Sequence, residues 1–80
     1  MPGKSAPTFG RILRKRRRAK GLSQEELASV AGVHRTFVSM LERGVRTPSL
    51  DVVLKLANGL DTTATSLVED LDRAMSQGRD

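Results

Sequence analysis

The stretch from Ser23 to Arg43, SQEELASVAGVHRTFVSMLER, restricts the fold of this 80-residue chain more than any other feature. Ser23 followed three residues later by Glu26 matches a capping box, in which each side chain bonds the backbone of the other residue, and it predicts the start of a helix. Gly32 predicts the end of that helix, because glycine takes a positive φ without steric cost. A second periodic run comes directly after it. The stretch therefore predicts two short helices that share a small core.

The second helix of this stretch carries polar side chains opposite its apolar ones. Val38 and Leu41 lie three residues apart and predict its buried face. The side chains expected to point away from them are Arg35, Thr36, Ser39, Met40 and Arg43. Such a set of donors, acceptors and one flexible apolar group suits contact with base edges in a DNA major groove. Plain packing within a helical bundle is the alternative explanation of the same pattern.

The whole stretch resembles the helix-turn-helix of the phage Cro and C1 repressor family, also called the XRE family. The resemblance continues through ERGVRTPSL and covers residues 9–71. It rests on the capped helix, the turn glycine, the apolar Val33 after it and the Glu-Arg-Gly, which recur together in register. It implies an all-α, five-helix, lambda-repressor-like DNA-binding domain. It also implies that residues 35–43 form the recognition helix, which docks in the major groove of double-stranded operator DNA with palindromic half-sites.

The resemblance implies roles for individual residues as well. The implied base contacts are Arg35, Thr36, Ser39, Met40 and Arg43, and the implied phosphate contacts are Gln24, Phe37, Arg46 and Thr47. Gln24 would act together with backbone N–H groups at the start of its helix. Arg17 lies four residues after Leu13, which turns it toward the edge of the core and requires a buried partner. The family keeps an Arg and a Glu at matching places, so we expect an ion pair between Arg17 and Glu42.

The charge is unevenly distributed along the chain. Residues 1–20 carry eight Lys or Arg and no acid, residues 21–60 carry four of each sign, and residues 61–80 carry five acids against two bases. The basic N-terminal part favours an approach to phosphates, although a solvated helix face explains the run RKRRRAK equally well. With two Phe and no Trp or Tyr, the chain offers little surface on which unpaired bases could stack. Double-stranded DNA is therefore favoured over single strands and RNA.

Length and composition exclude several classes of protein. Eighty residues form at most one domain, and the absence of Cys with a single His excludes disulfides, thiolate sites and a zinc site. No apolar run approaches the about 20 residues needed to span a bilayer. So small a helical chain offers no obvious cleft for catalysis. We expect no enzyme, no cofactor or metal, no small-molecule ligand and no membrane partner, and a cytoplasmic, nucleoid-associated protein.

The remaining segments predict three further helices around the central pair. Residues 1–7 predict a disordered N-terminal arm, residues 8–76 the DNA-binding domain, and residues 77–80 a frayed C-terminus. The expected helix caps are Thr8, Ser49 and Thr63. The expected apolar positions of the fourth helix are Leu50, Val53, Leu54, Leu56 and Ala57. The family usually has a glycine where Asp61 comes after this helix, and Asp can accept the left-handed conformation at modest cost.

The last helix has apolar side chains with little left to pack against in so small a domain. These side chains are Leu67, Val68, Leu71 and Met75. Left exposed, they would form a sticky patch, so we expect a two-fold homodimer. Within the family, the chain looks most similar to restriction–modification controller proteins, while phage Cro-like repressors share the pattern. The alternative function is that of an antitoxin, which would hold a toxin and repress its own operon with the same fold.

Overall fold

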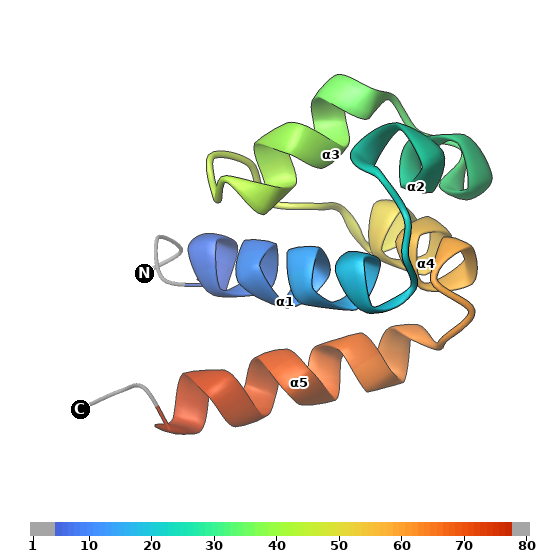
Figure 1. Cartoon of the computed structure of the whole chain (residues 1–80). Helices are drawn as coiled ribbons and strands as arrows, with labels where there is room; N and C mark the ends of the chain where they lie inside the picture. The colour runs from blue at the N-terminus through green and yellow to red at the C-terminus, as the bar shows by residue number, and fades with distance from the viewer. Residues whose placement is uncertain (1–4, 78–80) are drawn as a thin grey trace.

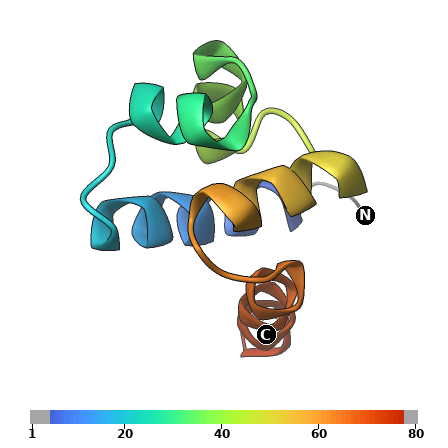
Figure 2. The same cartoon turned by 90° about the vertical axis from the view of Figure 1, so that its right-hand side faces the viewer.

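The computed structural model describes residues 5–77. Within them the chain forms five α-helices and no strand, which confirms the all-α expectation. The helices are α1 (Ser5–Ala19), α2 (Gln24–Ala31), α3 (Arg35–Glu42), α4 (Leu50–Gly59) and α5 (Ala64–Gln77). Figure 1 shows α1 between the α2–α3 pair above it and α5 below it. Helix α4 packs against α2 and α5, as the turned view in Figure 2 helps to trace.

The expected caps start three of the five helices. The Ser23 hydroxyl accepts the Glu26 N–H at 3.0 Å, and the Glu26 carboxylate accepts the Ser23 N–H at 2.8 Å, so the predicted capping box is present. Ser49 and Thr63 each accept a backbone N–H three residues further on, at 3.2 and 3.1 Å. These bonds satisfy N–H groups that have no partner within a helix. Local chemistry therefore fixes where α2, α4 and α5 begin.

Left-handed residues end the helices at the expected places. Gly32 closes α2 with φ 74°, and its N–H bonds back to carbonyls of that helix. After α4, Asp61 takes φ 56° in the position where the family usually has glycine. Lys20 Nζ donates to the Asp61 carboxylate at 2.8 Å, which holds this residue next to the end of α1. The prediction that Asp61 would accept the left-handed conformation is thus confirmed.

The first helix begins earlier than the sequence analysis predicts. Helix α1 starts at Ser5, so the assignment of residues 5–7 to a disordered arm, with Thr8 as the cap, is wrong. Pro7 is tolerated because residues of a first helical turn have no intrahelical partner for their N–H groups. Ala6 is buried, which gives this extra turn a packing contact. Residues 1–4 of the predicted arm and 78–80 of the predicted frayed end lie outside the described residues, and Gln77 ends α5.

One hydrophobic core joins all five helices. Its fully buried side chains are Leu13, Leu27, Val38, Leu41, Leu56 and Leu67. Two residues expected in the core are instead exposed, since Leu50 is 81% and Leu54 58% accessible. They lie four residues apart on a strip of α4 next to the one that turns Val53 inward. The helical period alone did not separate these two strips.

Gly10 lets α1 approach the last turn of α3 very closely. A Cβ atom at this position would lie 2.6 Å from the carbonyl oxygen of Glu42 and would also meet that of Leu41. Backbone atoms cannot move aside as a flexible side chain would. The absence of a side chain at Gly10 therefore sets the distance between α1 and α3, and the sequence analysis missed it.

Candidate nucleic-acid interface

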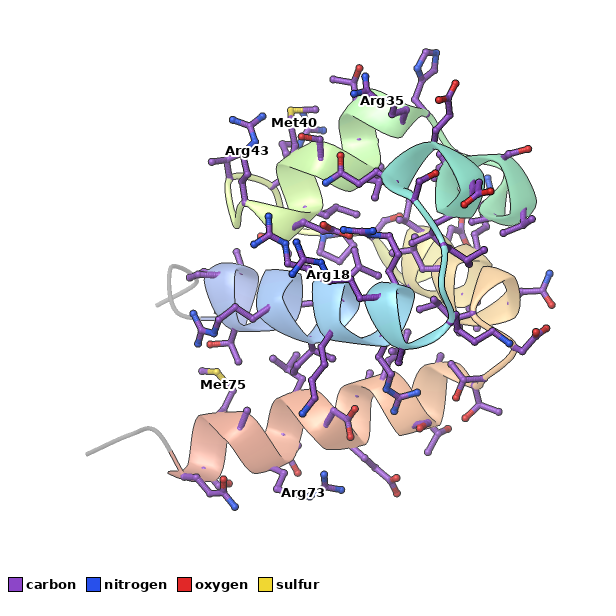
Figure 3. The ribbon with its side chains drawn as sticks, in the orientation of Figure 1. Arg18, Arg35, Met40, Arg43, Arg73 and Met75 are labelled. Carbon is purple, nitrogen blue, oxygen red and sulfur yellow. The ribbon has the colours of Figure 1, made fainter. Side chains whose placement is uncertain are left out.

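Helix α3 presents a continuous outward arc of polar side chains. Arg35, Thr36 and Arg43 are exposed, and Ser39 and Met40 are half-buried. Figure 3 shows the labelled members of this set along the edge of α3 that faces away from α1 and α5. At about 100° per residue, Glu42 bounds this arc on one side and Phe37 on the other. We call these two sides the Glu42 flank and the Phe37 flank.

An ion pair fixes the Glu42 flank. Arg17 Nε donates to Glu42 Oε2 at 2.6 Å, and Arg17 Nη2 donates to Oε1 at 3.0 Å, in the two-pronged geometry that suits a guanidinium and a carboxylate. The Glu42 side chain is completely buried, and Arg17 Nη1 donates to the Leu22 carbonyl oxygen at 2.8 Å. The two residues paired in the sequence analysis therefore lie in direct contact, and they tie α1 to the end of α3.

The electrostatics of this pair favour the charged forms. Burial alone would raise the pKa of Glu42, but the hydrogen bonds from Arg17 and Gln24 and the nearby arginine charges bring it below its usual value. The hydrogen bond to Glu42 raises the pKa of Arg17 further. Both groups are therefore ionised at neutral pH.

Gln24 belongs to the same cluster. Its side-chain amide Nε2 donates to Glu42 Oε1 at 3.0 Å, so the first residue of α2 is attached to the last residue of α3. An amide carries two N–H donors, which leaves one for a ligand. The phosphate contact assigned to Gln24 stays a prediction, and its side chain is already held in place by α3.

The Phe37 flank joins α3 to the loop before α4. The Arg46 guanidinium lies 5.4 Å from the centre of the Phe37 ring, within the range of a cation–π contact. Arg46 and Thr47 are exposed beside it. Phe37 has no side-chain donor, and its N–H donates to the His34 carbonyl oxygen at 3.0 Å. The phosphate contact assigned to Phe37 stays a prediction, and its ring lies against Arg46.

The protein-family description Helix-turn-helix matches residues 13–67, which contain both flanks and the outward arc. This chain belongs to the helix-turn-helix family. The match includes α2, the turn at Gly32 and α3, the stretch on which the sequence resemblance rests.

Several helix-turn-helix proteins are similar to the whole domain. The chain is 39% identical over 62 residues to control protein C.BamHI of Bacillus amyloliquefaciens, with 76% of each protein covered. The chain also superposes on the structure of restriction-modification controller protein C.AhdI from Aeromonas hydrophila, with a TM-score of 0.75. The two sequences are 48% identical, and the match covers 78% of this chain and 94% of that one. A third similar structure is the tetramer of restriction-modification controller protein C.Esp1396I in complex with its natural 35-base-pair operator. Its sequence is 26% identical, the TM-score is 0.79, and the match covers 86% of this chain and 91% of that chain. These similarities confirm the Cro/C1-type resemblance, the lambda-repressor-like fold and the likeness to controller proteins.

The residues predicted to join two copies of this helix-turn-helix domain fall into two groups. Leu67 has no exposed surface and packs in the core of its own chain, so its assignment to a dimer interface is wrong. Val68 is 47% exposed, and Leu71 and Met75 are half-buried. Leu67 faces inward because α5 must also close the core over α1 and α4.

Two shallow apolar grooves meet on the α4–α5 side. One, of about 560 Å³, is lined by Ala64, Thr65, Val68, Glu69, Leu71, Asp72 and Met75. The other, of about 180 Å³, is lined by Ser5, Ala6, Phe9, Thr47, Pro48, Leu50, Val53, Val68 and Leu71. Val68 and Leu71 line both, so the grooves form one surface, which we call the α4–α5 face. Leu50 was expected in the core, and its contribution to this face was not predicted from the sequence.

None of the helices within residues 5–77 combines the length and the apolar character that a membrane span requires. In the same residues, no three His, Cys, Asp or Glu side chains gather in a group that could hold a metal ion. The grooves on the α4–α5 face and between α1 and α5 are open surface depressions.

Proposed function

We propose that this protein is a sequence-specific transcriptional regulator that binds double-stranded operator DNA through α3. The observation that carries the proposal is the outward arc of α3, which has the exposed Arg46 on its Phe37 flank and the Gln24 amide held on its Glu42 flank. A major groove admits a helix and is bordered by phosphates on both sides. An arc of hydrogen-bonding groups with an arginine on one side and an amide donor on the other suits that environment.

Individual residues have different parts in this proposal. Arg35 stands at the first position of α3 and is exposed, so its planar fork can bond the O6 and N7 atoms of a guanine. Thr36 can contact a thymine methyl group beside it. The remaining proposed base contacts are Ser39, Met40 and Arg43. Gln24, Arg46 and Thr47 are proposed to contact phosphates, which would position the protein on any sequence.

Selection of bound sites from a pool of random duplex DNA tests this function. The expected result is one enriched motif, bound at least about a thousandfold more tightly than a scrambled duplex of the same length. The Arg35→Ala variant, selected in parallel, should enrich a motif that is less defined at one base pair in each half-site. A pool that stays random after several rounds would overturn the proposal.

We also propose that the regulator binds as a two-fold homodimer through the α4–α5 face. Leu50 and Val68 expose large apolar side chains on this face, and a monomer would leave them in water. A dimer would bring two recognition helices to major grooves roughly 34–36 Å apart, or a multiple of that distance, and so favour palindromic half-sites.

Sedimentation of the purified protein tests the dimer directly. The Val68→Glu variant should sediment as a monomer, because two buried carboxylates would meet near the symmetry axis. Val30→Glu is the matched control, since Val30 is similarly exposed, at 55%, but lies on α2. A parent protein that stays monomeric at high micromolar concentration would overturn the dimer, and a different co-purifying protein on this face would favour the antitoxin alternative.

We further propose that the operator controls genes of a restriction–modification system. The 48% identity to C.AhdI and the 39% identity to C.BamHI support this subtype. Footprinting on DNA upstream of the protein's own gene should reveal a protected site. A selected motif that is absent from the neighbourhood of any restriction or modification gene would overturn the subtype and leave DNA binding intact.

A further inference from the structure

The basic run of α1 is divided among different partners. Arg16 donates to Asp70 Oδ2 from Nε at 3.0 Å and from Nη2 at 2.8 Å, so it is used by α5. Arg17 forms an ion pair with Glu42 of α3, and Lys20 forms one with Asp61, which follows α4. Arg16 and Arg17 therefore serve the fold, and the interpretation of the whole run as a solvated helix face does not apply to them, while Lys20 stays exposed in a surface ion pair.

Arg14, Lys15 and Arg18 remain. Lys15 lines the groove between α1 and α5, whereas Arg14 and Arg18 share another face of α1. They lie four residues apart, so their side chains are neighbours on the helix surface. Arg14 Nε is 3.6 Å from Glu42 Oε1, which places this face on the Glu42 flank of α3. Figure 3 shows Arg18 on the side of α1 toward α3 and away from α5. Gln24 bonds the same Glu42 oxygen, so the three side chains surround one edge of the interface.

Neither arginine is needed to satisfy Glu42. Arg17 already bonds both carboxylate oxygens, Gln24 bonds one of them, and the 3.6 Å separation of Arg14 is too long for a hydrogen bond. The Arg14 side chain is 50% exposed. Within residues 5–77, no hydrogen bond or ion pair holds the Arg18 side chain, which is also exposed. Arg18 can therefore turn toward a ligand without breaking any side-chain contact. Arg14 gives up only its 3.6 Å ion pair with Glu42, whose oxygens stay bonded to Arg17 and Gln24.

We propose that Arg14 and Arg18 form a phosphate-contacting pair on the Glu42 flank, across α3 from Arg46 on the Phe37 flank. The inference rests on the proposed docking of α3 in the major groove. With α3 in the groove, the two flanks face the two backbones that border it. Arg46 serves one backbone, and without Arg14 and Arg18 the other would meet Gln24 alone. The pair contacts the DNA backbone and positions the protein, so it does not select a sequence.

The salt dependence of binding distinguishes this pair from a solvated helix face. Each phosphate contact contributes about 0.9 to the slope of log K against log salt. The double variant Arg14→Gln/Arg18→Gln should lower the slope by about 1.8 on the operator and on a scrambled duplex alike. At about 0.1 M salt, each lost contact should weaken binding roughly eightfold, if binding at 1 M is unchanged. The preference for the operator should stay as in the parent protein.

The matched control is Lys15→Gln/Arg73→Gln, which removes the same charge. Both residues line the groove between α1 and α5, and Figure 3 shows Arg73 on the far side of α5 from α3. The control should leave the slope within a few tenths of the parent value. If it lowered the slope as much as the double variant did, net charge would explain the effect and the pair would be overturned.

Two further variants guard against loss of folding. Arg18→Gln alone removes no hydrogen bond or ion pair within residues 5–77 and should lower the slope by about 0.9. The conservative double variant Arg14→Lys/Arg18→Lys keeps both positive charges, so its slope should be close to that of the parent protein. An unchanged slope in Arg18→Gln and in the folded Arg14→Gln/Arg18→Gln variant would overturn the proposed pair. The proposed function would still stand in that case if Arg35→Ala lost the preference for the operator. A parent protein that bound no duplex would overturn both.

Discussion

Glu42 connects the interior of the molecule to the proposed DNA-binding surface at the scale of one residue. Its side chain has no exposed surface, yet Arg17 and Gln24 bond it from two other helices. A buried carboxylate is stable only when it is paired and hydrogen-bonded. The end of α3 is therefore held by electrostatic contacts as well as by apolar packing.

The first prediction concerns this ion pair. Arg17→Ala or Glu42→Ala should lower the free energy of unfolding by about 3–5 kcal/mol, because each leaves a buried charge without its partner. Replacing both residues with apolar side chains of similar volume should cost much less. Urea denaturation of the three variants measures the difference, and single variants with parental midpoints would contradict it.

The second prediction concerns pH. The pKa of Glu42 is lower in the folded protein, so this group stabilises the fold above its unfolded pKa of about 4.3. That contribution is lost as the pH falls through the folded pKa. The hydrogen bond from Arg16 lowers the pKa of Asp70 and acts in the same direction. Between about pH 5 and pH 2, Glu42→Gln should lose less stability than the parent, and equal losses would argue against a role for the carboxylate.

The third prediction separates two arginines of the interface. Arg35→Ala should cost about 1–3 kcal/mol of binding on the operator and little on scrambled DNA, because only the operator offers the right base edges. Arg46→Ala should weaken both and lower the salt slope by about 1. Titrations of both duplexes across a salt series measure this. An unchanged operator preference in Arg35→Ala would remove α3 from the role of reader.

At the scale of the helices, the contact between α1 and α3 depends on a missing side chain. Gly10→Ala should destabilise the fold by about 1–3 kcal/mol, because the added methyl group meets the carbonyl oxygens at the end of α3. In an exposed helix the same change would stabilise by about 1 kcal/mol. Thermal unfolding of Gly10→Ala, with the exposed Lys15→Ala as a control, shows whether the added methyl group destabilises or stabilises the fold. A stabilised Gly10→Ala would mean that α3 moves aside freely.

Helix starts and stops could be predicted where one side chain decides them. The bonds of Ser23, Ser49 and Thr63 involve residues three positions away, so sequence alone carries the information. The start of α1 could not be predicted, because Ala6 is buried and lines a groove with Thr47 and Pro48, which are distant in sequence. The same reason explains Leu67 and Leu50, whose burial depends on which neighbour covers each strip of helix.

The candidate site was predictable to a similar degree. The outward arc of α3 agrees with the period of Val38 and Leu41, and the structure gives it the expected exposure. The roles of Phe37 and of the basic run were not predictable, since they depend on three-dimensional partners. Phe37 meets Arg46 across a loop, and Arg16 meets a carboxylate 54 residues away.

At the scale of the whole molecule, the α4–α5 face and the outward arc belong to different sides of one small domain. The fifth prediction is that Val68→Glu weakens binding to a duplex with two half-sites far more than to a duplex with one, because joined recognition helices bind as a unit. Val30→Glu should leave both affinities unchanged. Gel-shift titrations on the two duplexes test it, and equal losses would place Val68 in the fold rather than between subunits.

The neighbouring residues Arg16 and Arg17 fix the rotation of α1 about its own axis relative to α3 and α5. Arg16 reaches α5 and Arg17 reaches α3, although the two arginines are adjacent in the sequence. Inserting or deleting one residue between Gly10 and Arg16 would turn the two parts of the helix by about 100° relative to each other. Gly10 would then no longer face α3 while both arginines kept their partners. Helix α1 therefore tolerates substitution at its exposed positions but no change in length between Gly10 and Arg17, and related chains should differ there in composition and never in residue count.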